Sequence, residues 1–547
     1  MMHDSQKEWQ PEPVDTVWFI EAPGKANSLQ ALLRSLGHEV RVQATKGHFM
    51  TMPDMLTDTG IDENMHDFAR APKDPVLYRR IRAEARSARN VVIATDADME
   101  GDVIAWDVAE AIRDIHPSPM RVKVRAMDAD SIREAMEQAL PVRKEDAIAG
   151  RARALVDRAI GSAMARKGLG AGRVSCGMLG LVVHGRVSTG RLTLTAEATD
   201  GGRPWKLTLP VKSPLTRDVA RRLEALPMPD MGIAHSEPFS FSPGHMGDIM
   251  VRSSEVLGLK PAQTAAAMQT AYETGRLSYP RATSRGMTRA AARKMRKILG
   301  QGFDDRRVKE KAPSDVHDAP HPIGDFNPAH NPERLGEVEG VRILIGRDLV
   351  RCGQRHMREY ADTTPLKAFL TGKGIPAEVV TLLVKSEWFR ESGPAYPGRE
   401  NYVEQELIDI TPEQALLEAC MTAGLGKAST WSTHIESFLE KGLVTDRMEL
   451  TAEGQTMAAS LPQDLLNPRL SVAIEGICEK GVALTQDTPA GKEPWEHMAG
   501  KIVGSMPARI SSAIRSVLSS PQPRVDHRRV MEPSGPENGA GMKQEAS

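Results

Sequence analysis

Two segments near the start of the chain each consist of a short apolar run followed by apolar residues at helical spacing. Residues 17–20, VWFI, lead to a turn at Pro23 and Gly24, and Leu29, Leu32, Leu33 and Leu36 then follow helical spacing up to Gly37. The run VVIAT at 91–95 is followed by DADMEGD and by a helical stripe at Ile104, Val108 and Ile112. Strands that alternate with helices predict an α/β fold with a mostly parallel sheet, as in Rossmann-like domains, over about residues 14–140.

The remaining chain divides into segments that differ in composition and in the spacing of their apolar residues. An Ala- and Arg-rich stretch that ends in glycines predicts basic helices over 141–187, and alternation such as LTLTAEA and WKLTLPV predicts short antiparallel strands over 188–240. Helical spacing returns in 241–330 and again within 331–520, which is expected to be a helical domain. The Pro-, Gly- and charge-rich stretch 521–547 is expected to be disordered.

Bulk composition limits the class of protein. A chain of 547 residues is long enough for several domains, and its net charge of -1 means that a polyanion has to be held by local basic patches. The four cysteines form no CxxC pair, which argues against zinc ribbons and a disulfide scaffold. No apolar run approaches the roughly 18 residues of a membrane span. We therefore expect a soluble, cytoplasmic protein without a membrane partner.

Acidic residues gather where the second apolar run ends. Asp96 and Asp98 lie two apart and Glu100 follows at the turn into a helix, so we expect the three carboxylates to converge. Hard oxygen ligands of this kind suit Mg²⁺. An EF-hand is disfavoured because a strand precedes the loop and its twelfth position is Asp107. A solvated acidic turn that caps the helix stays open.

Glu21 and Lys25 follow the first apolar run in the same way. If the two predicted strands are neighbours in a parallel sheet, the acids and Lys25 share its carboxyl edge, where open α/β sheets bind ligands. Glu21 is then a further candidate ligand for the metal.

The stretch YETGRLSYPRATSRGM, 272–287, holds a tyrosine beside a proline and an arginine. Taken alone, Tyr279 is either one more buried aromatic or a nucleophile, and most single tyrosines are structural.

In this order, Glu21, Lys25 and the DADMEG segment resemble a Toprim domain, and SYPRATSR resembles the Y-x-R-T-D-S segment of type IA DNA topoisomerases. The stretch HDAPHPI at 317–323 resembles that family's H-E-A-I-R-P-T. RALVDRAIG with GLGAGRV, and GLGKASTW at 424–431, are similar to its DNA-contacting segments. Thr283, Asp102 and Asp318 depart from the family's usual acids. The cysteines make the topoisomerase III branch the nearer match.

The resemblance implies roles for particular residues. Tyr279 would attack a DNA phosphate and retain the 5′-phosphate, Arg281 would favour its phenolate and neutralise charge, and His317 would hydrogen bond the scissile phosphate. Lys25 would protonate the leaving 3′-oxygen and Glu21 would act as base in resealing, with Mg²⁺ on the acids. The implied DNA-binding residues are Arg153, Asp157, Arg158, Arg173, Lys427 and Ser429.

The expected activity is therefore ATP-independent, Mg²⁺-dependent cleavage, passage and religation of single DNA strands by a monomer, which relaxes negative supercoils, decatenates, or does both. Few aromatics suggest contacts to the backbone of single-stranded or underwound DNA. A Toprim nuclease or primase-like enzyme stays an alternative, and so does a catalytically impaired DNA-binding relative. Without the resemblance, the arginines could equally be a solvated helix face paired with local acids.

Overall fold

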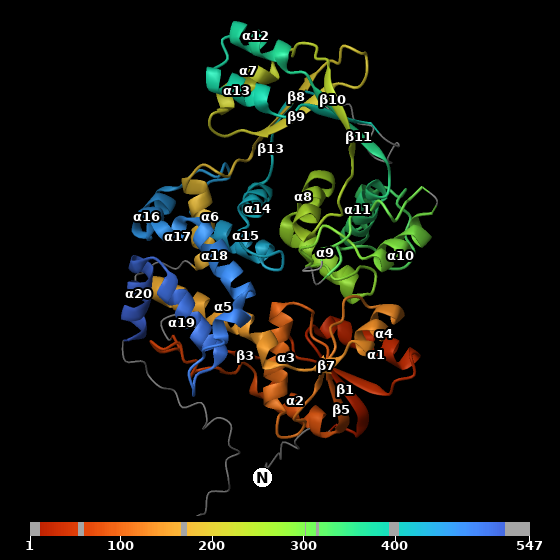
Figure 1. Cartoon of the computed structure of the whole chain (residues 1–547), viewed down its shortest axis with the longest axis vertical. Helices are drawn as coiled ribbons and strands as arrows, with labels where there is room; N and C mark the ends of the chain where they lie inside the picture. Colours follow the sequence, from red (N-terminus) through yellow and green to blue (C-terminus); the bar gives the residue numbers. More distant parts are fainter. Residues whose placement is uncertain are drawn as a thin grey trace, which may run out of the picture.

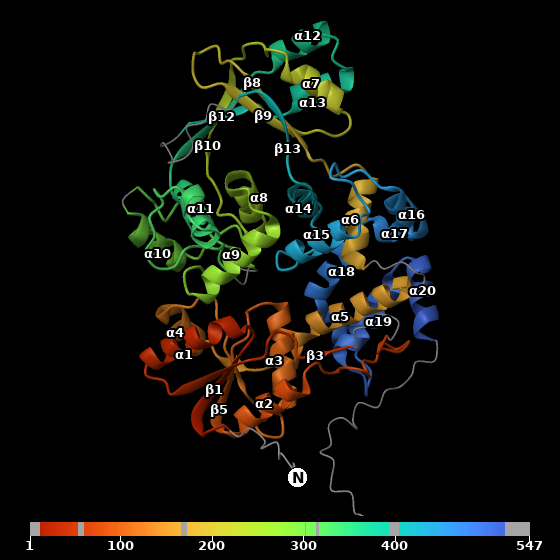
Figure 2. The same ribbon diagram turned by 180° about the vertical axis from the view of Figure 1, so that it is seen from behind.

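The computed structural model of the chain describes residues 11–52, 59–165, 172–300, 302–312, 317–392 and 404–519. The glycines at 168–171 and the segment 521–547 lie outside the described residues. Figures 1 and 2 show a β-rich arch at the top, two helical modules side by side beneath it, and an α/β domain at the base. None of the described helices is long and apolar enough to cross a membrane.

The N-terminal α/β domain has a five-stranded sheet in the order β2-β1-β5-β6-β7. Its strands are β1 (Val14–Ile20), β2 (Val40–Ala44), β5 (Ala88–Ile93), β6 (Met120–Arg121) and β7 (Leu140–Pro141), with a separate pair β3 (Met50–Thr51) and β4 (Ala71–Pro72). Its helices are α1 (Ala26–Ser35), α2 (Pro75–Arg86), α3 (Met99–Ala111) and α4 (Ala129–Glu137). Within the five-stranded sheet, all pairings except that of β6 with β7 are parallel, which confirms the predicted sheet.

The tyrosine module is the helical unit above this domain that carries Tyr279 (Figure 1). It consists of α8 (Met246–Leu257), α9 (Pro261–Glu273), α10 (Arg289–Leu299) and α11 (Glu337–Cys352). Gly258, with a φ of 65°, ends α8 in a left-handed conformation that favours glycine. Tyr279 lies in the connection between α9 and α10.

The second helical unit, which we call the helical module, is built from two distant parts of the sequence. Its helices are α5 (Lys144–Ala165), α6 (Arg173–Val183), α14 (Pro412–Ala423), α15 (Trp431–Glu440), α16 (Ala452–Ser460), α17 (Gln463–Leu466), α18 (Pro468–Glu479), α19 (Pro494–Ser505) and α20 (Ala508–Leu518). Their buried apolar side chains form one continuous core with those of the tyrosine module.

The arch is a six-stranded sheet in the order β10-β11-β12-β9-β8-β13, with three short helices. Its elements are β8 (Gly190–Ala196), β9 (Trp205–Pro210), α7 (Arg217–Glu224), β10 (Ile233–Phe239), β11 (His356–Ala361), α12 (Thr364–Gly372), α13 (Ala377–Lys385), β12 (Phe389–Ser392) and β13 (Glu406–Asp409). The predicted strands within 188–240 are confirmed, but they make up only half of this sheet.

From its sequence we had expected the range 331–520 to be a helical domain. In the structure this range is not wholly helical. Strands β11, β12 and β13 and helices α12 and α13 leave the helical module and complete the arch. The reason is that β11 pairs with β10 across more than a hundred intervening residues. Short strands whose partners are so remote leave little local signal, since β propensity depends on cross-strand packing.

Candidate active site

Two acids lie at the carboxyl edge of the N-terminal sheet. Glu21 directly follows β1 and Asp96 follows β5, and these two strands are parallel neighbours, as the sequence analysis required. Asp98 caps α3, accepting a hydrogen bond from the Gly101 amide at 2.8 Å. A Cβ at Gly101 would lie 2.0 Å from the Asp96 carbonyl oxygen, so this close turn requires glycine.

Two buried cations hold this turn in place. The Lys25 Nζ lies 2.6 Å from Asp96 Oδ1 and 4.1 Å from the centre of the Tyr272 ring. Arg121 donates hydrogen bonds to the main-chain oxygens of Thr95, at 2.7 Å, and Asp96, at 2.8 Å. Because these groups are buried and paired, the acid edge has a fixed geometry.

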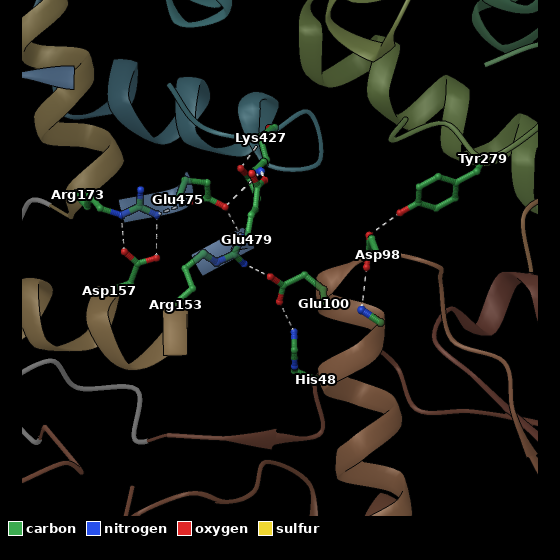
Figure 3. Close-up of polar contacts among 12 residues, drawn as sticks. His48, Asp98, Glu100, Arg153, Asp157, Arg173, Tyr279, Lys427, Glu475 and Glu479 are labelled. Carbon is green, nitrogen blue, oxygen red and sulfur yellow. Dashed lines mark hydrogen bonds and ion pairs between the residues drawn. The ribbon is translucent and has the colours of Figure 1, made fainter. Parts of the chain in front are cut away.

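Tyr279 reaches the acid edge from the tyrosine module. Its hydroxyl donates a hydrogen bond of 2.6 Å to Asp98 Oδ2, across 181 residues of sequence (Figure 3). The side chain is only 2% exposed and packs with Tyr272 in the core of the N-terminal domain. Its ring stacks on that of His317 with centroids 4.1 Å apart. The structure thus brings Tyr279, Lys25, Glu21, Asp96, Asp98 and His317 together.

The environment of Tyr279 opposes its ionisation. Burial raises the pKa of Tyr279 well above its usual value, and Asp98 and Asp96 raise it further, whereas Arg281 lowers it by less. Arg281 thus favours the phenolate in direction, as expected, but burial and the two acids outweigh it in this arrangement. The proton has to leave as the oxygen reacts.

Glu21 is the acid whose protonation changes near neutral pH. Burial raises the pKa of Glu21 to about 7, and the negative charges of Asp96 and Asp98 add to this effect, while Arg281 and Lys25 oppose it. Its Oε2 atom is buried and has no hydrogen-bond partner among the described residues. Burial, more than the charge of the neighbouring acids, therefore keeps this carboxyl group from ionising at lower pH.

His317 is held as a neutral ring. Its Nε2 lies 2.8 Å from the Ala97 carbonyl oxygen, which can only accept, so Nε2 carries the proton. Burial lowers the pKa of His317 to about 4. The Nδ1 atom is then a buried acceptor, and no described residue hydrogen bonds it. In this state the Nδ1 atom of His317 can accept a hydrogen bond from a hydroxyl, and the predicted contact with the scissile phosphate requires a ring that carries a proton on Nδ1.

The predicted three-acid ligand set is not formed. Glu100 points away from Asp98 (Figure 3), with a carboxylate oxygen 2.7 Å from His48 Nε2 and the other paired with Arg153. Among the described residues, no three His, Cys, Asp or Glu side chains are arranged to hold a metal ion. The reason is that Asp98 is a helix cap and Glu100 lies in the first turn, so the alternation of a strand no longer applies.

A divalent cation would suit the chemistry of the acids at this edge, although it does not suit the arrangement of the described side chains. Glu21 Oε2 has no hydrogen-bond partner among the described residues, and burial together with the charges of Asp96 and Asp98 raises the pKa of Glu21. Carboxylate oxygens are the ligands that Mg²⁺ prefers. Glu21, Asp96 and Asp98 are the acids that a divalent cation would draw together, although among the described residues they do not form a ligand set in this arrangement.

The predicted DNA-binding residues are largely paired with acids. Arg153, Arg173 and Lys427 converge from α5, α6 and the turn before α15 on Glu475 of α18 (Figure 3). Asp157 binds Arg173 at 2.7 Å. By contrast, Arg158 donates to the Thr59 carbonyl oxygen, and Ser429 is half-buried in the turn before α15.

Sequence reasoning missed four residues of this region. Tyr272 packs edge-on against Tyr279, with ring centroids 5.6 Å apart, and its buried hydroxyl has no partner among the described residues. Arg121 fixes the acid turn, His48 holds Glu100, and Glu475 pairs with the cations. Only Tyr272 had a local signal, because it lies seven residues before a candidate nucleophile. The other three depend on contacts between remote segments.

Comparisons with known proteins agree with this arrangement. Residues 16–127 match the Toprim domain family. The chain is 22% identical over 511 residues to DNA topoisomerase 1 of Pseudomonas aeruginosa, which covers 81% of this chain and 57% of that protein. It is 27% identical over 174 residues to DNA topoisomerase 1 of Campylobacter jejuni, covering 30% and 24%. The chain therefore spans little more than half the length of the first of these relatives.

A solved structure has the same overall fold. Full-length topoisomerase I from Thermotoga maritima superposes with a TM-score of 0.59 at 15% identity, covering 92% of this chain and 90% of that one. The likeness thus includes the arch and both helical modules as well as the N-terminal domain. We conclude that residues 16–127 form a Toprim domain and that the chain as a whole has the fold of topoisomerase I from Thermotoga maritima.

Proposed function

We propose that this chain is a type IA DNA topoisomerase in which Tyr279 is the nucleophile. Tyr279 attacks a backbone phosphorus, takes the 5′-phosphate as a phosphotyrosyl ester and releases a 3′-hydroxyl, which later reverses the reaction without ATP. The observation that carries this proposal is the 2.6 Å contact between the Tyr279 hydroxyl and Asp98, which joins the tyrosine module to the acid edge.

Asp98 is placed to take the proton of the nucleophile. Its Oδ2 already accepts the Tyr279 hydrogen bond, so the proton can pass to it as the oxygen–phosphorus bond forms. This route is compatible with the high pKa of Tyr279, because no free phenolate has to accumulate. Arg281, which interacts electrostatically with Tyr279 and Glu21, supplies positive charge for the phosphorane-like transition state.

Glu21 is better suited than Lys25 to exchange a proton with the 3′-oxygen. With a pKa of about 7, Glu21 populates both forms at neutral pH, so it can donate during cleavage and accept during resealing. Lys25 is tied to Asp96 at 2.6 Å and positions that acid. We therefore assign Lys25 an electrostatic role and Glu21 the proton transfer in both directions.

A bound Mg²⁺ would add positive charge beside the neighbouring phosphate. Glu21, Asp96 and Asp98 are the side chains that would hold it, and His317 Nδ1 can accept a hydrogen bond from the freed 3′-hydroxyl. These groups would keep the cut ends in line for religation.

The burial of Tyr279 sets a requirement for access. At 2% exposure its hydroxyl cannot meet a phosphodiester until the tyrosine module and the N-terminal domain separate. Single-stranded or underwound DNA is the substrate that suits this narrow contact, and relaxation and decatenation are both compatible with it. We propose that the chain acts as a monomer on DNA.

The test is formation of a covalent adduct. Purified protein is incubated with single-stranded DNA, with and without Mg²⁺, and quenched in denaturant. The 5′-labelled and 3′-labelled substrates are run in parallel. The proposal predicts protein-linked DNA that retains the 3′ label and is lost in Tyr279→Phe. Nicked DNA without an adduct would favour a Toprim nuclease, and intact DNA would favour a DNA-binding relative.

A further inference from the structure

A single carboxylate occupies the centre of the predicted DNA-binding cations. Glu475 of α18 lies 3.2 Å from Arg153, 3.1 Å from Arg173 and 3.6 Å from Lys427. These cations come from three separate elements, and the Glu475 side chain is 13% exposed (Figure 3). A carboxylate held by several guanidinium and ammonium groups has the same chemistry as a phosphate oxygen held by them.

The other acids of the region complete the neutralisation. Lys427 also pairs with Glu479, one turn further along α18, while Arg153 pairs with Glu100 and Arg173 with Asp157. The three cations thus face four carboxylates. Among the described residues this region does not act as a net positive patch, although its cations are the ones expected to contact DNA.

The contacts of α18 are specific. Arg173 donates hydrogen bonds to the Ser471 hydroxyl at 2.7 Å and to the Ser471 carbonyl oxygen at 2.9 Å, which aligns the start of α18 on α6. Burial alone would raise the pKa of Glu475, but Arg153, Arg173 and Lys427 together hold it below its ordinary value. Glu475 is therefore a carboxylate stabilised in its charged form by the cations around it.

We propose that Glu475 occupies the position of a DNA phosphate among Arg153, Arg173 and Lys427, and that its displacement limits how tightly the chain binds single-stranded DNA. The inference rests on the proposed action on DNA, and it adds a residue on α18 that sets affinity. A phosphodiester that enters the cluster exchanges one set of ion pairs for another. Fewer counterions are then released than three free cations would release.

The test is equilibrium binding to a fluorescent single-stranded oligonucleotide by the full-length chain and its variants, all in a Tyr279→Phe background, so that no adduct forms and affinity is read apart from cleavage. We expect Glu475→Gln to tighten binding about tenfold at moderate salt, because binding no longer displaces a charge. The plot of log affinity against log salt should also steepen by roughly one phosphate contact, about 0.7 for a single strand. A purely structural role for Glu475 would not steepen it.

Three variants separate charge from packing. Glu475→Asp keeps the charge and should stay near wild type. Glu479→Gln, at a half-exposed position that pairs with Lys427, should tighten binding by a smaller factor. The matched control is Glu391→Gln in the arch, since Glu391 also lies between two arginines, Arg351 and Arg358, and is 19% exposed. The affinity of this variant for the oligonucleotide should equal that of the wild type.

The outcomes distinguish this inference from the proposed function. If wild type binds DNA and both Glu475→Gln and Glu479→Gln leave affinity and salt slope unchanged, Glu475 is not a phosphate surrogate although the topoisomerase proposal stands. If neither wild type nor the variants bind single-stranded DNA, both are wrong. Binding that appears only in the two α18 variants supports the inference.

Discussion

Removing the ionisable group of Glu21 should change how stability depends on pH. The pKa of Glu21 is raised from 4.5 to about 7 in the folded chain, mainly by burial. The folded state therefore keeps a proton that the unfolded state has lost, and stability falls as pH rises from about 4.5 to about 7. A difference of this size corresponds to roughly 3 kcal/mol at most.

In the Glu21→Gln variant this side chain cannot ionise, so the variant should not lose stability as the pH rises. Wild type and variant should be about equally stable near pH 4.5, and the variant should become more stable by up to roughly 3 kcal/mol above pH 7. Added Mg²⁺ should reduce the gap by stabilising the wild-type carboxylate. The measurement is calorimetric unfolding of both full-length chains across this pH range, following the transition of the N-terminal domain, with the exposed Glu39→Gln as control. A stability difference that does not vary with pH would refute the assignment of a raised pKa to Glu21.

Three further predictions concern the same site. Arg281→Ala should lower the rate of adduct formation by about a hundredfold in a quenched time course, as expected when a charge-stabilising group is removed; a loss below about tenfold would exclude that role. Gly101→Ala should destabilise the chain by about 2 kcal/mol in thermal unfolding, since its Cβ meets the Asp96 carbonyl oxygen, whereas Gly504→Ala has open space and should not. Removal of divalent cations by EDTA should slow religation of preformed adduct at least about tenfold, and equal religation with and without Mg²⁺ would show that the acids need no metal.

Local sequence patterns were sufficient to predict the sheet edge. The positions of Glu21 and Asp96 after two apolar runs, with Lys25 in the intervening turn, predicted a shared edge, and the parallel pairing of β1 with β5 confirms it. The pattern succeeded because the ends of adjacent parallel strands must meet. It failed at Glu100, where the chain had already entered α3 and the side chain pointed toward His48.

Properties that depend on remote segments could not be predicted. Arg281 is adjacent to Tyr279 in sequence, but burial and Asp98 decide the pKa of that tyrosine. Arg153 and Arg173 were expected to face DNA, yet Glu475, some three hundred residues later, pairs with both. Sequence spacing reports neighbours along one element, whereas these effects come from packing between modules.

The central claim is that Tyr279, and no other tyrosine, carries the DNA phosphate. Tyr272 packs against it in the same site, so a mutation alone could act indirectly. The decisive measurement is tryptic digestion of the denatured adduct, removal of the DNA to its terminal nucleotide, and mass spectrometry of the modified peptide. We expect a 5′-nucleotidyl group on Tyr279 within the peptide from Leu277 to Arg281. Modification of Tyr272, or an unmodified peptide from DNA that was cut, would contradict it.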